Sequence, residues 1–437
     1  MLKWCYQKEK RRTRMKKNWL LRGLSVLAVG AMLVGCSSKK EDTGDKTKDG
    51  KEVITYAIWD TNQEPGMKKM AETFEEKNPN VKVNVEVTPW DQYWTKLDAA
   101  ATGESLPDVF WMHSNEAYRY MSNDMLMDLT DSTAKAEGVD LEKFPKDIVE
   151  FYSLEGKQYA IPKDIDTIGL WYNKTLFDEN GVDYPTEDWT WDDLVKASIK
   201  LTDESKGIYG FAAPNNGHEG YWNFIFQNEG AILNSTHDKS EINQTNSVEA
   251  LQFYADFITK HKVSPTADQM AENKPVSFMQ SGRLAMGLFG SWMLADFKAN
   301  DYMKENVDVA VLPKGKVQAS VYNGLGNAVA ADTKHKEAAV KFVEFLGSEE
   351  ANLISAEEGS AIPAYEGTAT KWVDSSKEYN VQVYIDMLDY AVIRPFSKET
   401  IKVETIETDN LADVLSGAKT AKEGADIIAE EVNNVLK

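Results

Sequence analysis

Apolar residues recur with two different periods over the first part of the chain. An unbroken apolar run at 53–59, VITYAIW, is typical of a buried strand, and valine at every second position of 81–87, VKVNVEV, predicts another. Between them, apolar residues at 67, 70, 71 and 74 share one helix face. A second helix over 91–101 leads to a strand that begins at PDVFWM, 107–112. This order is typical of a parallel α/β layer.

The segment YAIPKDIDTIGLWYNK, 159–174, interrupts that alternation. Its proline and its two acids, Asp164 and Asp166, favour an exposed crossing over a core strand. Further elements are expected after it: helices that begin at Thr190 and near Ser247, a strand at 327–331, NAVAA, and a helix over 339–346.

The first 35 residues have the composition of a secretory signal. The basic stretch KEKRRTRMKK, 8–17, precedes an apolar run from 23 to 35 that is too short to cross a bilayer comfortably. A buried helix of the fold is the alternative, and the arginines before the run argue against it. We expect translation to start at Met15, because this start leaves a leader of 21 residues, a usual size.

Leu33-Val34-Gly35-Cys36 resembles the lipobox of bacterial lipoproteins. The resemblance implies that the Cys36 thiol carries a diacylglyceryl group and that Cys36 is the first mature residue. Buried acyl chains contribute roughly 0.8 kcal/mol per CH2, which would anchor the protein to the membrane. Residues 37–52 contain no hydrophobic residue, and we expect a disordered tether of roughly 20 Å. The signal would thus span 1–35 and the lipidated tether 36–52.

Charge is unevenly distributed along the 437 residues. The formal net charge is −21, but residues 1–35 hold nine Lys/Arg and one acid, so the remainder carries −29. Such a body repels phosphate backbones, which argues against nucleic-acid binding. The acidity is alternatively only a means of solubility. The second cysteine, Cys5, falls in the leader, so the mature protein would have no free thiol.

Motifs of the common enzyme classes do not occur in the sequence. It contains no phosphate loop, no His-Glu-x-x-His pair, no Gly-x-Ser-x-Gly elbow and no Cys-x-x-Cys. The five histidines, at 113, 218, 237, 261 and 335, lack metal-ligand spacing. We therefore expect no metal, no cofactor and no catalytic residue. The many acids nevertheless leave a carboxylate pair for glycoside hydrolysis open as an alternative.

Two tryptophans, Trp59 and Trp111, lie at the carboxyl ends of predicted parallel strands, where ligands bind to open α/β sheets. Polar side chains follow both: Asp60, Asn62 and Gln63 after the first, and His113 after the second. A sugar packs its C–H faces on aromatic rings, and its hydroxyls hydrogen-bond to carboxylates and amides. Each tryptophan alone could equally be the rim of the core, but the two strand ends together favour a ligand.

Longer segments resemble family 1 extracellular solute-binding proteins, the sugar-binding lipoproteins of ABC importers. They are WDTNQEPGMKKMAETFEEKNPNVKVNVE, LPDVFWMH, IPKDIDTIGLWYNKTLFDENGV, FMQSGRLAMGLFGSW, AVLPKG and KHKEAAVKFVEFL. The resemblance implies an α/β, two-lobed periplasmic-binding-protein-like fold of type II, each lobe a mostly parallel sheet flanked by helices. Lobe 1 would comprise 53–163 plus 319–361, and lobe 2 would comprise 166–312 plus 364–437.

The resemblance also implies ligand contacts beyond the two strand ends: Asp164, Asp166, Trp222, Gly290, Trp292, Asn323 and Arg394. The two acids would accept hydroxyl protons, and the two tryptophans would stack on sugar rings. Gly290 would let a ligand approach the backbone. Asp166 is alternatively a cap of the crossing segment, and Trp171 and Tyr172 are expected to pack inside lobe 2.

The family implies a monomer, anchored by lipid at the outer face of the cytoplasmic membrane of a Gram-positive-type envelope. It would deliver a sugar or oligosaccharide to the permease of an ABC transporter by closing its lobes on the ligand, without covalent chemistry. A secreted glycoside hydrolase is the main alternative. The same fold could instead bind a polyol, a glycerophosphodiester or a polyamine, and the scarcity of basic candidates argues against phosphate.

Overall fold

A computed structural model describes residues 46–134 and 138–437 of the chain. The predicted signal, Cys36 and most of the predicted tether lie outside the described residues. The expectation of disorder up to residue 52 is corrected at its end, because Lys46 pairs with Glu52 across a turn that leads into the first strand. Among the helices that the structure describes, none is long and apolar enough to cross a membrane.

The first sheet begins as the apolar periods predict. β1 (Glu52–Ile58) lies between β2 (Val81–Val87) and β3 (Val109–Met112), and it runs parallel to both. α2 (Glu64–Lys77) and α3 (Trp90–Thr102) connect these strands. The predicted apolar face of α2 is buried, namely Met67, Met70, Ala71 and Phe74. The predicted parallel α/β layer is confirmed.

One antiparallel strand, followed by one that runs in the same direction as β3, completes this sheet. β12 (Gly326–Val329) pairs with β3 on one side and with β6 (Ala160–Pro162) on the other, so the strand order is β2-β1-β3-β12-β6. α15 (Lys336–Leu346) packs on β12 and buries the predicted helix face of Ala339, Phe342, Val343 and Leu346. The strand expected at NAVAA and the helix after it are both confirmed.

The crossing segment after β6 is buried, and the prediction that it is exposed was wrong. It contains β7 (Asp164–Ile165) and leads into β8 (Ile168–Asn173), and every residue from 160 to 173 is buried. Asp166 exchanges backbone hydrogen bonds with Asn323, and β7 pairs with β13 (Ile362–Pro363). Because neighbouring segments satisfy its backbone polar groups, this chain segment does not need solvent.

β8 is the central strand of a second sheet. It lies between β10 (Val307–Ala310) and β9 (Met286–Gly290), and both pairings are antiparallel. The expectation of a mostly parallel sheet in this part of the chain is therefore corrected, since an apolar run predicts a buried strand but not its direction. Trp171 of β8 is fully buried, with its ring 4.4 Å from that of Phe297, as expected.

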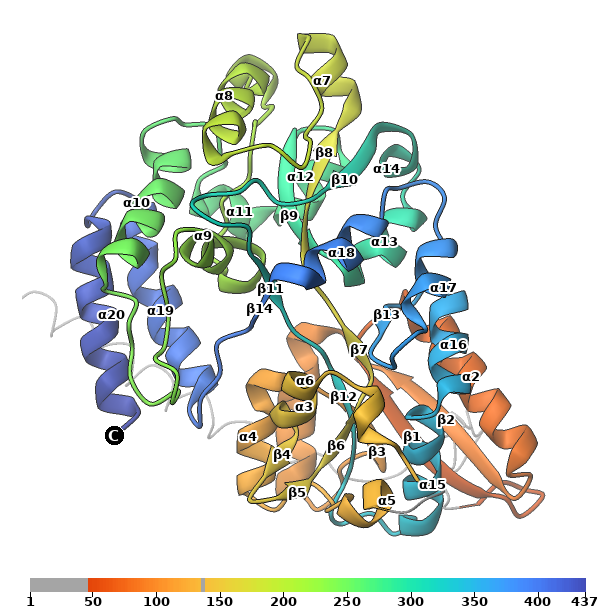
Figure 1. The fold of residues 1–437 in the computed structure, drawn as a ribbon. Coiled ribbons are helices and arrows are strands. Elements are labelled where there is room, and N and C mark those ends of the chain that lie inside the picture. The colour runs from red at the N-terminus through yellow and green to blue at the C-terminus, as the bar shows by residue number, and fades with distance from the viewer. Residues whose placement is uncertain (1–45, 135–137) are drawn as a thin grey trace, which may run out of the picture. The chain divides into compact units, whose positions relative to one another are not determined.

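Most of the remaining chain is helical (Figure 1). α8 (Trp191–Leu201) starts with the capping box predicted at Thr190, and α10 (Thr245–Thr259) covers the helix expected near Ser247. The chain between β8 and β10 also forms α7 (Lys174–Asn180), α9 (Trp222–Gln227), α11 (Ala267–Glu272), α12 (Pro275–Gln280), α13 (Leu294–Ala299) and α14 (Asp301–Asn306).

Further helices follow β3 and α15. After β3 come α4 (Ser114–Ser122), α5 (Thr130–Ala134), α6 (Lys146–Phe151) and the short hairpin of β4 (Ser153–Leu154) and β5 (Lys157–Gln158). After α15 come α16 (Glu349–Glu357), α17 (Ala369–Asp374), α18 (Gln382–Asp386), α19 (Thr400–Leu415) and α20 (Ala421–Val435). α19 and α20 pack on each other and on α10 (Figure 1).

A short parallel pair brings two distant segments together. β11 (Ser320–Tyr322) pairs with β14 (Ala391–Ile393), and the N–H of Arg394 donates to the carbonyl of Tyr322 at 2.8 Å. Because the register continues past both strands, Asn323 and Arg394 become neighbours although 70 residues of chain separate them.

α19 places one carboxyl group in the interior. Glu407 is 1 % exposed, and its Oε2 accepts hydrogen bonds from the Tyr221 hydroxyl at 2.9 Å and from Trp222 Nε1 at 2.8 Å. Burial raises the pKa of Glu407 from 4.5 to about 7, and the neighbouring Glu404 adds to the rise. The folded state thus holds a proton on this group at pH values where the unfolded chain releases it.

We expect the stability contributed by this raised pKa to be lost as the pH rises from about 4.5 through about 7. Glu407→Gln removes the titration but keeps an acceptor for Tyr221 and Trp222. Relative to wild type, the variant should gain on the order of 3 kcal/mol of unfolding free energy between pH 4.5 and pH 8. Urea denaturation across this range measures it, with the exposed Glu430→Gln as control. A wild-type minus variant difference that does not change with pH would contradict the buried, protonated carboxyl.

Gly324 provides a second test of the fold. A Cβ at this position would lie 2.3 Å from the backbone carbonyl oxygen of Asp164, which cannot move without breaking the crossing segment. Gly324→Ala should therefore lower the unfolding free energy by roughly 3 kcal/mol. Gly103→Ala is the matched control, because its nearest contact would be an ordinary 3.4 Å. Equal urea midpoints for the two variants would show that the segment is not packed as described.

Candidate ligand-binding site

An aromatic cluster lies at the carboxyl end of β1. Trp59 follows β1 directly and is partly buried. Its ring meets those of Trp90, Tyr93 and Trp111 edge to face, at centroid distances of 5.1, 5.1 and 5.0 Å. Trp90, the first residue of α3, is 40 % exposed and also lies 5.4 Å from the His113 ring. The cluster presents partly exposed aromatic surface beside the polar residues that end β1 and β3.

Trp111 does not offer a ligand a face of its own, which corrects the expectation for this residue. It lies within β3, has no exposed surface, and donates from Nε1 to the Tyr56 hydroxyl at 2.7 Å. Lys163 Nζ lies 4.2 Å from its ring centroid. Trp111 therefore supports Trp59 from the core, because a side chain inside the strand points into the sheet's packing rather than past its end.

The residues after Trp59 form a compact polar turn. Asp60 accepts from the N–H of Asn62 at 2.8 Å and from Gln63 Nε2 at 2.9 Å. Asn62 is exposed and donates from Nδ2 to Asp296 of α13 at 3.3 Å. Burial raises the pKa of Asp296, and Asp60 adds to the rise. The turn thus connects the end of β1 to α13, the helix that follows β9 of the second sheet in the chain.

The two acids of the crossing segment have different surroundings. Asp164 is buried and both of its oxygens have partners, Lys163 Nζ at 2.6 Å and the N–H of Leu325 at 2.8 Å. Burial raises the pKa of Asp164 although Lys163 lies beside it. Lys163 also donates to Gln63 at 3.1 Å. These contacts make Asp164 a positioning residue in this structure, rather than the free hydroxyl acceptor that we expected.

Asp166 lies near His218 and Trp292. Its Oδ1 lies 3.1 Å from His218 Nε2, and the His218 ring lies 5.1 Å from the ring of Trp292. The neighbouring Glu219 accepts from the N–H of Gly290 at 3.2 Å. Burial raises the pKa of Glu219, with Asp166 contributing to the rise. A carboxylate, an imidazole and an indole therefore converge here from three separate segments.

Gly290 serves a different purpose from the one predicted. A Cβ at this position would lie 1.9 Å from the Trp292 ring, so the close approach that requires glycine is made by Trp292. The expectation that a ligand uses this space is corrected, because the indole already occupies it.

His113 connects β3 to distant segments. Its Nε2 lies 3.4 Å from Asn323 Nδ2 and 3.3 Å from Arg394 Nη1, while Nδ1 lies 2.7 Å from Asn115 Oδ1. Burial, with the charges of Arg394 and His218, holds the pKa of His113 well below its usual range. We assign the neutral tautomer with the proton on Nδ1, because Nε2 then accepts from the two donors that face it, while Nδ1–H donates to Asn115 Oδ1 and leaves the N–H of Asn115, 3.2 Å away, without this acceptor.

Arg394 is 5 % exposed and forms an ion pair with Glu404 through Nη2. Its guanidinium lies over the ring of Trp222, 5.3 Å from the centroid. Trp222 is itself 3 % exposed, and a Cβ on Gly217 would lie 2.2 Å from its ring. The expected stacking of Trp222 on a sugar is therefore corrected: its faces carry Arg394 and Gly217, and it orients the guanidinium.

The structure brings most of the predicted residues together in connected contacts. One chain of contacts runs from Trp59 through His113 and Asn323 to Arg394, and another joins Asp166 to Trp292 through His218. The sequence analysis missed five residues of these networks: Trp90, Lys163, His218, Glu219 and Glu404. Trp90 could have been found from the sequence, because residues four apart, such as Trp90 and Trp94, share one face of a helix. No comparable pattern marked His218, which has no other histidine near it in the sequence.

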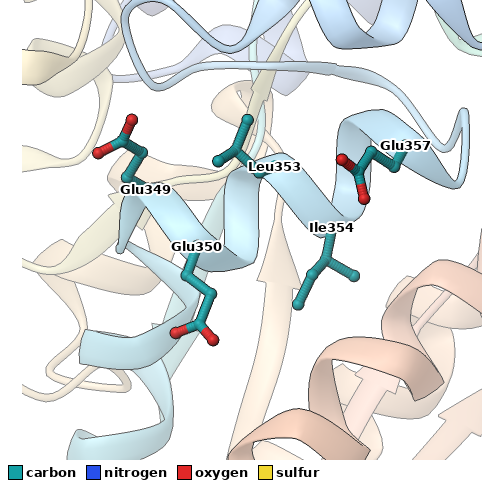
Figure 2. A pocket seen from close by; sticks show the side chains of 5 residues that line it. All are labelled: Glu349, Glu350, Leu353, Ile354 and Glu357. Atoms are coloured by element: carbon teal, nitrogen blue, oxygen red, sulfur yellow. The ribbon is translucent and has the colours of Figure 1, made fainter.

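A separate hollow lies on the outer face of α16 (Figure 2). It is lined by Glu349, Glu350, Leu353, Ile354 and Glu357 of that helix alone. None of the predicted site residues belongs to it, and we do not place the ligand there. Among the described residues, no group of His, Cys, Asp or Glu side chains is arranged to hold a metal ion.

Comparison with known proteins places the chain in a family. The sequence model described as "Bacterial extracellular solute-binding protein" matches residues 60–353. The maltodextrin-binding protein of Bacillus subtilis (strain 168) is 24 % identical to the chain over 438 residues, which is 97 % of each protein.

Solved structures are similar over nearly the whole described chain. An ABC substrate-binding protein from Listeria monocytogenes, in complex with cycloalternan, is 29 % identical with a TM-score of 0.82, covering 88 % of this chain and 98 % of that one. An ABC transporter solute-binding protein from Thermotoga lettingae, bound with alpha-D-tagatose, is 25 % identical with a TM-score of 0.78, covering 88 % and 100 %. The predicted two-lobed, periplasmic-binding-protein-like fold is thereby confirmed. Since the family model covers more than half of the sequence, the chain belongs to the bacterial extracellular solute-binding proteins.

Proposed function

We propose that the protein binds a sugar or oligosaccharide outside the cytoplasm and delivers it to the permease of an ABC transporter. The observation that carries this proposal is the junction of partly exposed aromatic rings, Trp59, Trp90 and Trp292, with carboxylates and amides from several segments. This combination suits a ligand with apolar C–H faces and many hydroxyls. The similarity to a relative named for maltodextrin and to a protein solved in complex with cycloalternan supports the same ligand class.

The surroundings of each candidate suggest its part in binding. Trp59, Trp90 and Trp292 would pack against sugar rings. Asp60, Asn62 and Asp166 would accept or donate hydroxyl hydrogen bonds, while Asn323 and Arg394 would donate. Gln63, Trp111, Asp164, Trp222 and Gly290 would act indirectly, because they are buried and their polar atoms or faces are occupied by neighbouring residues. Asp60 also has partners for both oxygens, but it is partly exposed.

Ligand-driven closure is the mechanism that we infer. We propose lobes of 53–163 plus 319–361 and of 166–312 plus 364–437. The contacts between these parts include those of Asn62 with Asp296 and of His113 with Arg394. A sugar that adds hydrogen bonds to both parts would bind the closed arrangement better than the open one and shift the population toward it. The permease would then recognise the closed form, and no covalent step is needed.

We also propose that the protein is a monomeric lipoprotein, held at the outer face of the cytoplasmic membrane through Cys36. A binding protein near its permease gains from confinement, since a short tether between Cys36 and the folded body limits the volume in which the ligand is released. No cofactor or metal enters the proposal.

Calorimetry with a panel of mono- and oligosaccharides tests the ligand class. At least one sugar should bind, and Trp59→Ala and Trp292→Ala should each weaken its binding by about tenfold to hundredfold. Losing an indole face against a sugar ring costs on the order of 1.5–3 kcal/mol. Trp189→Ala is the matched control, because this ring stacks on Phe177, away from the candidate residues.

Two outcomes would count against the proposal. If no sugar binds, the ligand belongs to another class. If sugars bind and new reducing ends appear on prolonged incubation, the protein is a glycoside hydrolase rather than a pure binding protein.

Expression of a Cys36→Ser variant in a Gram-positive host tests the anchor. Without the thiol no diacylglyceryl group can be attached, so the variant should appear in the culture medium while wild-type protein stays with the membrane fraction. The released variant should bind the same sugar with unchanged affinity. Retention of Cys36→Ser on the membrane would show that another segment is the anchor.

A further inference from the structure

Arg394 has more hydrogen-bond donors than the structure satisfies. Its guanidinium carries five N–H donors, of which Nη2 reaches Glu404 and Nη1 reaches His113. Nε is buried and has no partner among the described residues. A buried donor without an acceptor is unfavourable, and a ligand oxygen at this point would remove that cost.

His113 increases this surplus of donors. Its Nε2 has one lone pair, but both Arg394 Nη1 and Asn323 Nδ2 point at it, at 3.3 and 3.4 Å. One acceptor cannot satisfy two donors well, and both distances are long for hydrogen bonds between nitrogens. The cluster of Arg394, Asn323 and His113 is therefore prepared to receive an acceptor oxygen from outside the chain.

The charge around this cluster determines which oxygen it accepts. The positive charge of Arg394 is neutralised by Glu404, whose side chain remains 24 % exposed. The other nearby cation, Lys163, is paired with Asp164. Two further acids lie near: Asp166 of the crossing segment contacts His218, and Glu219 follows His218 in the chain. The positive groups Arg394 and Lys163 are therefore each paired with a carboxylate, and an anionic ligand would lose its hydration without gaining a net attraction.

We propose that Glu404 determines the charge class of the ligand: by neutralising Arg394, it lets the donor cluster accept an uncharged hydroxyl or ether oxygen and reject the carboxylate of an acidic sugar. Glu404 acts through Arg394 and is a positioning residue, since its hydrogen bond is to the guanidinium. This inference rests on the proposed sugar-binding function and adds to it a preference for neutral over acidic sugars.

Paired neutral and acidic probes test the inference. Calorimetry uses maltotriose, isomaltotriose, cellotriose and galactobiose, the same sugars oxidised to carboxylates at C6, and the methyl esters of those acids. Wild-type protein should bind its neutral sugar at least tenfold more tightly than the oxidised form, and the uncharged ester should recover part of the loss. The Glu404→Gln variant should bind the oxidised sugar more tightly than wild type does, because Arg394 then lacks a counter-ion. The ratio of the dissociation constants for the oxidised and the neutral sugar should therefore fall about tenfold.

Matched variants separate charge from structure. Glu399 lies at the start of the same helix, but its carboxylate pairs with Lys402 rather than with Arg394. The Glu399→Gln variant should therefore keep the wild-type ratio of affinities for the neutral and the oxidised sugar. The double variant Arg394→Gln, Glu404→Gln removes both charges and should also keep a preference for the neutral sugar, with weaker binding. If Glu404→Gln fails to fold, Arg394→Gln alone carries the test: Glu404 is then unpaired, and the oxidised sugar should be rejected more strongly than by wild type.

The outcomes distinguish the two proposals. If neutral sugars bind but Glu404→Gln weakens neutral and acidic probes by the same factor, Glu404 is merely structural and this inference is overturned. A wild-type preference for the oxidised sugar also overturns it while leaving the sugar-binding function intact. If none of the probes, neutral or acidic, binds to any variant, the proposed function itself fails and this inference fails with it.

Discussion

The buried crossing from β6 to β8 is the constraint on which the rest of the structure depends. It carries Lys163, Asp164 and Asp166 through an interior where an unpaired charge would cost several kcal/mol. Each charge is therefore satisfied locally, Asp164 by Lys163 and a backbone N–H, and Asp166 by His218. Because the partners come from other segments, folding this short stretch also fixes the positions of the segments around it.

The same constraint brings the candidate ligand groups together. Asn323 is placed by its backbone pairing with Asp166, and Arg394 is placed by the β11–β14 pair that ends beside Asn323. Asn323 and Arg394 then both direct hydrogen-bond donors at His113 Nε2. The proposed site for a hydroxyl-rich ligand is thus a by-product of satisfying buried polar groups, with a few donors that a ligand could use.

Occupied faces divide the candidates into those that can touch a ligand and those that support them. Trp111 and Trp222 are as aromatic as Trp59 and Trp292, but their rings are enclosed by Lys163 or by Arg394 and Gly217. The enclosed rings hold cations in position, whereas the partly exposed rings remain available for stacking. Residue type alone does not distinguish these two roles, since both require a large apolar ring.

The sequence by itself determined what depends on neighbours in the chain. Apolar periods determined β1, α2, β2 and α15. The grouping of polar side chains after Trp59 could be predicted because Asp60, Asn62 and Gln63 are close neighbours in the sequence. Strand direction in the second sheet, the burial of the crossing segment and the enclosure of Trp111 were decided only by the tertiary structure. So were the pairs His218 with Asp166 and Arg394 with His113, which 52 and 281 positions separate. The physical reason is that a periodic pattern reports which face of an element is apolar, whereas the partner of a buried charge is chosen by packing among segments whose distance in sequence says nothing about their distance in space.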